Sequence, residues 1–257
     1  MENSHTSNFS QLYLKIARLP MKTISLFVTK VPSVLSVCFL SLLIGGATIV
    51  RAQEVQVGGY FTTIVPQGQF KENITNNGYG GGGFFLVRLG PSPLLIGGDF
   101  GGVRYGSENH REPISSTIPN LQVNVGTSNN IFLAHFLLRA QPRKGLVRPY
   151  ADGLIGLKHL FTRTTISNLS GGEEIASNTD LSDTTLSYGF GGGLQIPLTK
   201  GLEGRILLDA NVRYLRGSQA EYLKKGSIRQ ENGLAVFDVL SSRTDVIAVQ
   251  IGVTFRF

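Results

Sequence analysis

Residues 245–257 alternate between apolar and polar side chains, and no other feature of the sequence restricts the fold more strongly. A period of two is the repeat of a β-strand, whose successive side chains point to opposite faces. The apolar face consists of Ile247, Val249, Ile251, Val253, Phe255 and Phe257. The opposite face includes Gln250 and Arg256. Such a strand could cover the core of a soluble sandwich, but it better suits a barrel wall with lipid outside and polar side chains inside.

Seven further segments alternate in the same way between breaks rich in glycine, proline and asparagine. We therefore expect eight strands, at 54–65, 79–90, 94–105, 131–141, 148–162, 184–198, 203–215 and 244–257. Each is about long enough to cross a bilayer when tilted. Short connections are expected at 90–93, 142–147 and 199–202, and long ones at 66–78, 106–130, 163–183 and 216–243. The pattern predicts an all-β fold, a single antiparallel up-and-down barrel with short periplasmic turns and long, mobile extracellular loops.

Charged side chains fall on the polar face of each expected strand. An Arg or Lys on the lipid face at mid-membrane costs about 2–4 kcal/mol, so we place these side chains in the lumen. The predicted interior network consists of Arg88, Asp99, His135, Arg139, Asp152, Lys158, Arg205, Asp209, Arg213 and Arg256. A regular hairpin around 142–147 would set Arg139 almost opposite Asp152. Eight strands leave little room beyond these side chains, so a packed network is favoured over the alternative, a gate or narrow anion-guiding channel.

Residues 1–52 have the character of an export signal. The uncharged segment 31–50 follows Lys22 and Lys30 and leads into Val50-Arg51-Ala52, which suits signal peptidase. We predict a signal peptide at 1–52, cleaved between Ala52 and Gln53, with Met21 as a candidate translation start, and a barrel domain at 53–257. The alternative is a retained transmembrane helix.

Charge and cysteine content restrict the functional classes. The chain has a formal net charge of +7, but the predicted leader carries four of these charges, which weakens any nucleic-acid interpretation. The one cysteine, Cys38, also lies in the leader, so the mature chain has neither disulfides nor thiolate metal sites. The glycine runs at 80–83 and 97–102 lack the Lys-Ser/Thr of a phosphate-binding loop. We expect no cofactor, no metal site and no catalytic residues.

Taken together, these features resemble the small outer-membrane β-barrel proteins of Gram-negative bacteria, of the OmpA-like, OmpX-like and opacity type. In that family the last strand typically ends in an aromatic residue that the insertion machinery reads, which implies an assembly signal at Phe255 and Phe257. Aromatic residues near strand ends, among them Tyr60, Tyr105 and Tyr150, would form the interfacial girdles. A soluble lipocalin-like barrel is the rival fold, and inward charges on several strands argue against it.

The resemblance implies a structural, adhesive or surface-interaction role carried by the extracellular loops. Expected partners are outer-membrane lipid and lipopolysaccharide, the insertion machinery, periplasmic chaperones and a surface or host partner. A porin-like channel is the alternative function. A lipid-modifying enzyme is a minor one, because it needs a histidine beside a serine and a carboxylate near the membrane surface, and His110, His135 and His159 do not offer that arrangement. We therefore predict that the protein is not an enzyme.

Overall fold

The computed structural model describes residues 54–115, 118–168, 174–198, 206–224, 226–231 and 234–257. The predicted signal peptide at 1–52, Cys38, the cleavage residues Ala52 and Gln53, and Arg205 lie outside the described residues. Among the described residues, no helix is long and apolar enough to cross a membrane.

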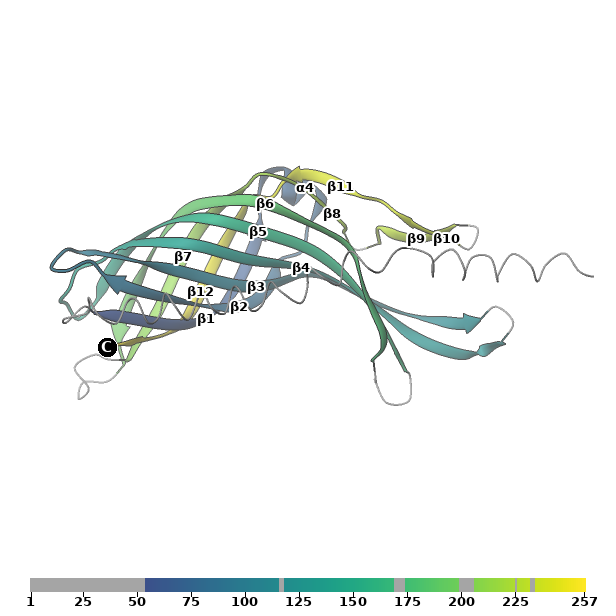
Figure 1. Ribbon diagram of the computed structural model, residues 1–257, viewed down its shortest axis with the longest axis horizontal. Coiled ribbons are helices and arrows are strands. Elements are labelled where there is room, and N and C mark those ends of the chain that lie inside the picture. The colour runs from purple at the N-terminus through teal and green to yellow at the C-terminus, as the bar shows by residue number, and fades with distance from the viewer. Residues whose placement is uncertain (1–53, 116–117, 169–173, 199–205, 225, 232–233) are drawn as a thin grey trace, which may run out of the picture. The chain divides into compact units, whose positions relative to one another are not determined.

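Eight antiparallel strands close into a barrel in the order β1-β12-β7-β6-β5-β4-β3-β2 (Figure 1). They are β1 (Val55–Pro66), β2 (Gly78–Arg88), β3 (Leu94–Ser115), β4 (Ile118–Ala140), β5 (Arg148–Asn168), β6 (Glu174–Pro197), β7 (Ile206–Gly217) and β12 (Val246–Arg256). Pairing of β1 with β12, from Gln56 opposite Arg256 to Pro66 opposite Val246, completes the ring and leaves no open edge within it. The predicted all-β, eight-stranded, up-and-down barrel is confirmed.

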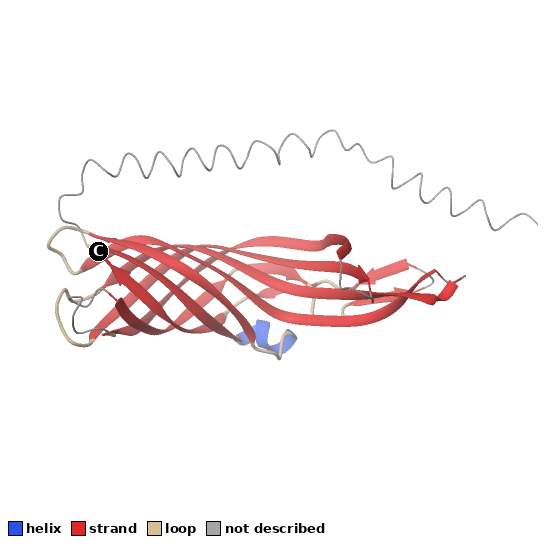
Figure 2. Ribbon diagram, turned by 90° about the horizontal axis from the view of Figure 1, so that it is seen from below, coloured by secondary structure: helices blue, strands red, loops and turns tan. Residues whose placement is uncertain are grey.

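Smaller elements lie in two of the long connections. The helix α4 (Gly68–Asn73) follows β1, and Figure 2 shows it at the rim of the barrel opposite the end that holds the C-terminus. The connection after β7 contains β8 (Gln219–Tyr222), β9 (Ile228–Glu231), β10 (Leu234–Phe237) and β11 (Leu240–Arg243). β8 pairs with β11 and β9 with β10, so this connection consists largely of two nested strand pairs, with the β9–β10 pair between β8 and β11 in the chain.

The other two long connections are continued strand pairs, which the sequence did not predict. β3 and β4 stay paired from Leu94–Ala140 to Ser115–Ile118, and β5 and β6 stay paired from Arg148–Gln195 to Ser167–Glu174. The strands run beyond the barrel and curve away from it (Figure 1). They pass the predicted ends at 105, 131, 162 and 184, because beyond the ring neither face of the strands is regularly buried. The apolar–polar alternation therefore disappears there while the backbone pairing continues.

The barrel wall is apolar outside and polar inside. Phe61, Phe136, Ile155, Phe190 and Ile251 point outward, and each is more than half exposed. The inward positions of the same strands hold fully buried arginine, lysine, aspartate and glutamine side chains. A soluble barrel such as a lipocalin would have the opposite polarity, whereas this arrangement suits an outer wall in contact with lipid.

Candidate functional site

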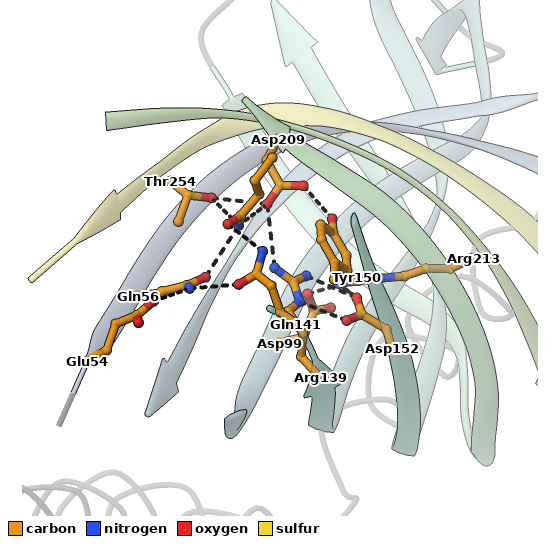
Figure 3. Close-up of polar contacts among 11 residues, drawn as sticks. Glu54, Gln56, Asp99, Arg139, Gln141, Tyr150, Asp152, Asp209, Arg213 and Thr254 are labelled. Carbon is orange, nitrogen blue, oxygen red and sulfur yellow. Dashed lines mark hydrogen bonds and ion pairs between the residues drawn. The ribbon is translucent and has the colours of Figure 1, made fainter. Parts of the chain in front are cut away.

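Two arginines and two aspartates form the centre of the lumen network (Figure 3). Arg139 lies opposite Asp152 on adjacent strands and donates two hydrogen bonds to its carboxylate, at 2.8 and 3.0 Å. Arg213 on β7 donates to Asp152 on β5 and, across the barrel, to Asp99 on β3, at 2.9 Å each. Each of the four side chains is at most 4% exposed as a residue, so the ion pairs cross the lumen without access to bulk water.

Asp209 anchors the same network on β7. Its carboxylate accepts hydrogen bonds from Tyr150, from Gln195 at 2.7 Å and from Thr254 at 3.1 Å, and it lies 3.5 Å from Arg139 Nη1. The Arg139 guanidinium also lies 3.6 Å above the centre of the Tyr150 ring, within the range of a cation–π contact. The guanidinium is thus held by charge on one side and by an aromatic face on another.

Glycines make room for the tyrosines of this network. A Cβ at Gly82 would come within 2.6 Å of Tyr60 Oη, and one at Gly193 within 2.5 Å of Tyr150 Oη. Tyr60 donates to Asp99 at 3.1 Å. The glycine-rich strands therefore serve the packing of the lumen, as the narrow interior of a small barrel requires.

A layer of glutamines lies closer to the short turns. Gln56, Gln141 and Gln195 hydrogen bond to one another around a triangle, at distances of 2.9, 2.8 and 3.3 Å. Next to this triangle, Arg88 forms an ion pair with Glu54 at 2.9 Å. Burial opposes the ionisation of Glu54, but the hydrogen bonds from Arg88 and Gln56 prevail and lower the pKa of this carboxyl.

The middle of the lumen contains a histidine–serine pair. His135 Nε2 lies 2.9 Å from Ser187 Oγ, a distance compatible with a nucleophile and its base. However, Ser187 is fully buried, and His135 Nδ1 has no hydrogen-bond partner, because Asp99 pairs with Arg213 and Tyr60 instead. The pair lacks both an orienting carboxylate and access for a substrate, so it is a packed polar contact. That the protein is not an enzyme stays a prediction.

Lys158 occupies the next level of the lumen. It is fully buried, and its ammonium group donates to the backbone carbonyl of Thr244. Among the described residues, no cluster of three or more His, Cys, Asp or Glu side chains could hold a metal ion.

An apolar cap covers the lumen at the end with the long connections. Phe70 of α4 is fully buried and packs edge-to-face against Tyr105 and Tyr222, with ring centroids 5.8 and 5.1 Å apart. Tyr222 Oη accepts from Asn73 at 2.9 Å, and Tyr105 Oη donates to the backbone carbonyl of Leu223 at 3.2 Å. The helix and β8 are therefore held together over the barrel mouth.

The structure brings together only part of the predicted interior set. Asp99, Arg139, Asp152, Asp209 and Arg213 form one network. Arg88, His135 and Lys158 are buried in separate layers, and Arg256 is half-buried. Phe255 and Phe257 are exposed, and their role in assembly stays a prediction.

Several residues of the lumen network were not predicted from the sequence, and three tyrosines lie elsewhere than predicted. Tyr60, Tyr105 and Tyr150 were expected in the interfacial girdles, but they point into the lumen and are at most 9% exposed. The alternation along their own strands could have placed two of them in the lumen, because Tyr60 lies on the same face as Gln56 and Tyr150 on the same face as Asp152. The predicted interior network also left out its uncharged members, namely Gln56, Gln141, Gln195 and Thr254.

No protein family model matches the sequence, and no curated protein matches it. Among similar solved structures, Neisserial surface protein A has a TM-score of 0.38 at 13% identity, over 80% of this chain and 97% of that chain. A major outer membrane protein from Thermus thermophilus has a TM-score of 0.44 at 12% identity, over 80% of this chain and 100% of that chain. The N-terminal β-barrel domain of Pseudomonas aeruginosa OprF has a TM-score of 0.31 at 14% identity, over 79% and 97%.

These similarities are too weak to carry a functional argument, so the assignment depends on the chain's own geometry. Eight antiparallel strands in a closed meander, an apolar outer wall and a charged lumen are the architecture of the small OmpA-like and OmpX-like outer-membrane barrels. At the level of the fold, the resemblance inferred from the sequence is confirmed.

Proposed function

We propose that the protein is an integral outer-membrane barrel of a Gram-negative-type bacterium. Its lumen is closed, and its function lies in the strand extensions on the cell surface. The extensions consist of residues 106–115 and 118–130 of β3 and β4 and residues 163–168 and 174–183 of β5 and β6. They present a structural or adhesive surface to an envelope or host partner. Delivery to the membrane requires periplasmic chaperones and the outer-membrane insertion machinery.

The outer wall supports the location in a membrane. Its outward positions hold large apolar side chains around the ring, such as Phe61 on β1, Phe136 on β4 and Phe190 on β6. Exposing this much contiguous apolar surface to water would favour aggregation, whereas lipid contact stabilises it.

The filled lumen is the observation that carries the surface role. The network around Asp152 and the glutamine layer fill the lumen towards the short turns, and the cap around Phe70 closes the other end. A solute would have to break buried ion pairs and displace a packed helix, so conduction is disfavoured against presentation of the extensions.

Trimming one extension tests the proposal. Replacing 163–183 by a tight turn removes the β5–β6 pairs beyond His159–Thr184 and leaves the barrel pairs from Arg148–Gln195 to His159–Thr184 intact. We expect the variant to fold, judged by heat-dependent migration in detergent gels. Cells that produce it should lose adhesion to epithelial monolayers or to plates coated with lipopolysaccharide.

A matched control changes the opposite end of the barrel. Lys144→Gln in the short turn at 142–147 should leave adhesion at the wild-type level. Undiminished adhesion by a folded 163–183 variant would contradict a role for this extension. The segment 216–243 is unsuitable for the same test, because Tyr222 and Leu223 are buried in the cap and their removal would destabilise it.

A further inference from the structure

A groove of 1340 Å³ lies on the outer wall across β2 to β6, where the extensions of β3 to β6 begin. Outward side chains along it include Tyr79, Arg104, Asn130, Phe132, His159 and Phe161. The pairing of β3 with β4 shifts register between Arg104 and Gly106, at the level of the groove. The groove is separate from the lumen network, because none of the residues that form the ion pairs around Asp152 lines it.

The position of Arg104 along β3 places the groove at the height of the lipid headgroups. The step from Leu94 to Arg104 covers about ten residues, which at about 3.3 Å per residue and a tilt of about 40° amounts to about 25 Å along the barrel axis. That height equals the apolar band of an outer-membrane barrel, which is about 25 Å. Arg104 therefore lies at its outer boundary.

Among the aromatic side chains of the groove lie polar side chains and the positive charge of Arg104. The Arg104 guanidinium donates one hydrogen bond to Asn130 Oδ1 at 3.3 Å, and none of the described acidic side chains lines the groove or forms an ion pair with it. His159 also lines the groove and is held in place by two contacts. Its ring stacks on that of Phe161, with the ring centroids 5.6 Å apart, and its Nδ1 lies 2.8 Å from Thr184 Oγ1. The remaining guanidinium N–H groups can bind an anionic oxygen acceptor.

Below the groove the outer wall is continuously apolar. Phe100, Phe136 and Leu157 are between 42% and 54% exposed and point outward on β3, β4 and β5. A ligand that binds both the apolar wall and the groove needs acyl chains that contact the wall and an anionic headgroup that contacts Arg104 in the groove. A free anion would contact only the groove.

We propose that this groove binds the phosphate-bearing headgroup of an outer-leaflet glycolipid, with Arg104 as the phosphate ligand and the aromatic rim packing against the sugar. The inference rests on the proposed location of the barrel in the outer membrane. It assigns a lipid site to the outer wall, where the extensions meet the membrane surface.

Native mass spectrometry of the barrel released from detergent micelles tests the site. The probes are bisphosphorylated lipid A and the same lipid after enzymatic dephosphorylation. We expect wild type to retain the bisphosphorylated lipid, and Arg104→Gln and dephosphorylation each to weaken retention about ten-fold or more, as for the loss of a charge-assisted hydrogen bond. Arg111→Gln, an equal charge change on the exposed part of β3, should bind as wild type does.

The possible outcomes separate the site from the proposed location. Retention that Arg104→Gln leaves unchanged, or that is equal for the dephosphorylated lipid, would overturn the phosphate site while the barrel stays a membrane protein. Displacement of the lipid by an equal concentration of inorganic phosphate would also overturn it, because the groove would then recognise a free anion. Failure of refolded wild type to enter lipid vesicles would refute the outer-membrane location, and the site with it.

Discussion

Asp152 shows how much of the lumen depends on a single side chain. Its carboxylate accepts hydrogen bonds from both Arg139 and Arg213, and all three side chains are almost completely buried. Asp152→Ala would leave two guanidinium groups short of a counter-charge in a packed interior, so we expect it to lower the free energy of unfolding by about 3–5 kcal/mol. Urea-induced unfolding in lipid vesicles measures the change.

Leu138→Ala is the control for this comparison, because Leu138 points outward from the same wall and is 42% exposed. Leu138→Ala should lower the free energy of unfolding by less than Asp152→Ala does. Equal and small effects of the two substitutions would mean that water fills the lumen and solvates the arginines.

Two glycines provide a second test at the level of single residues. A Cβ at Gly193 would come within 2.5 Å of both Tyr150 Oη and the backbone carbonyl of Ala210, whereas a Cβ at Gly153 meets nothing within 4 Å. Gly193→Ala should therefore destabilise the barrel by about 1–3 kcal/mol through overpacking. Gly153→Ala, on the neighbouring strand, should be nearly neutral in the same unfolding measurement. A similar loss of unfolding free energy in both variants would show that Tyr150 and its neighbours can shift to make room for the added Cβ.

At the level of elements, the sequence predicted the barrel strands because each has one face toward lipid and one toward the lumen. This contrast ends at the membrane boundary, so 106–130 and 163–183 read as loops although most of these residues are paired strand. The short helix α4 has a single buried residue, Phe70, which gives no helical period to detect.

The candidate site could also be predicted only in part from the sequence. Charge identified the inward aspartates and arginines, because charged residues are excluded from the lipid face. Aromatic and amide side chains occur at both the interface and the lumen, so charge could not assign Tyr60, Tyr150 or Gln195 to the network. Their partners come from strands distant in sequence, and only the register brings them together, as for Gln195 beside Gln56.

The cap can be tested as an element. Phe70 fills the space between Tyr105 and Tyr222, and Phe70→Ala would leave a cavity at the point where α4 contacts β8. We expect the helix to detach while the barrel stays closed, so trypsin should cleave after the exposed Lys71 several-fold faster. Phe136→Ala, which removes an outward aromatic side chain from β4, is the control and should leave this cleavage rate unchanged. An unchanged rate in Phe70→Ala would show that the cap does not depend on this contact.

For the whole molecule, the cap and the ion-pair network are two barriers in series, and a solute must pass both. Wild type should therefore give no steady conductance in a planar bilayer. Phe70→Ala should also be silent, because loosening the cap leaves Arg139, Asp152 and Arg213 paired across the other end. Conductance is expected only when Phe70→Ala is combined with Asp152→Ala, since each single change leaves one barrier in place. Steady, solute-selective conductance by wild type, or by Phe70→Ala alone, would favour the narrow-channel interpretation over a surface role.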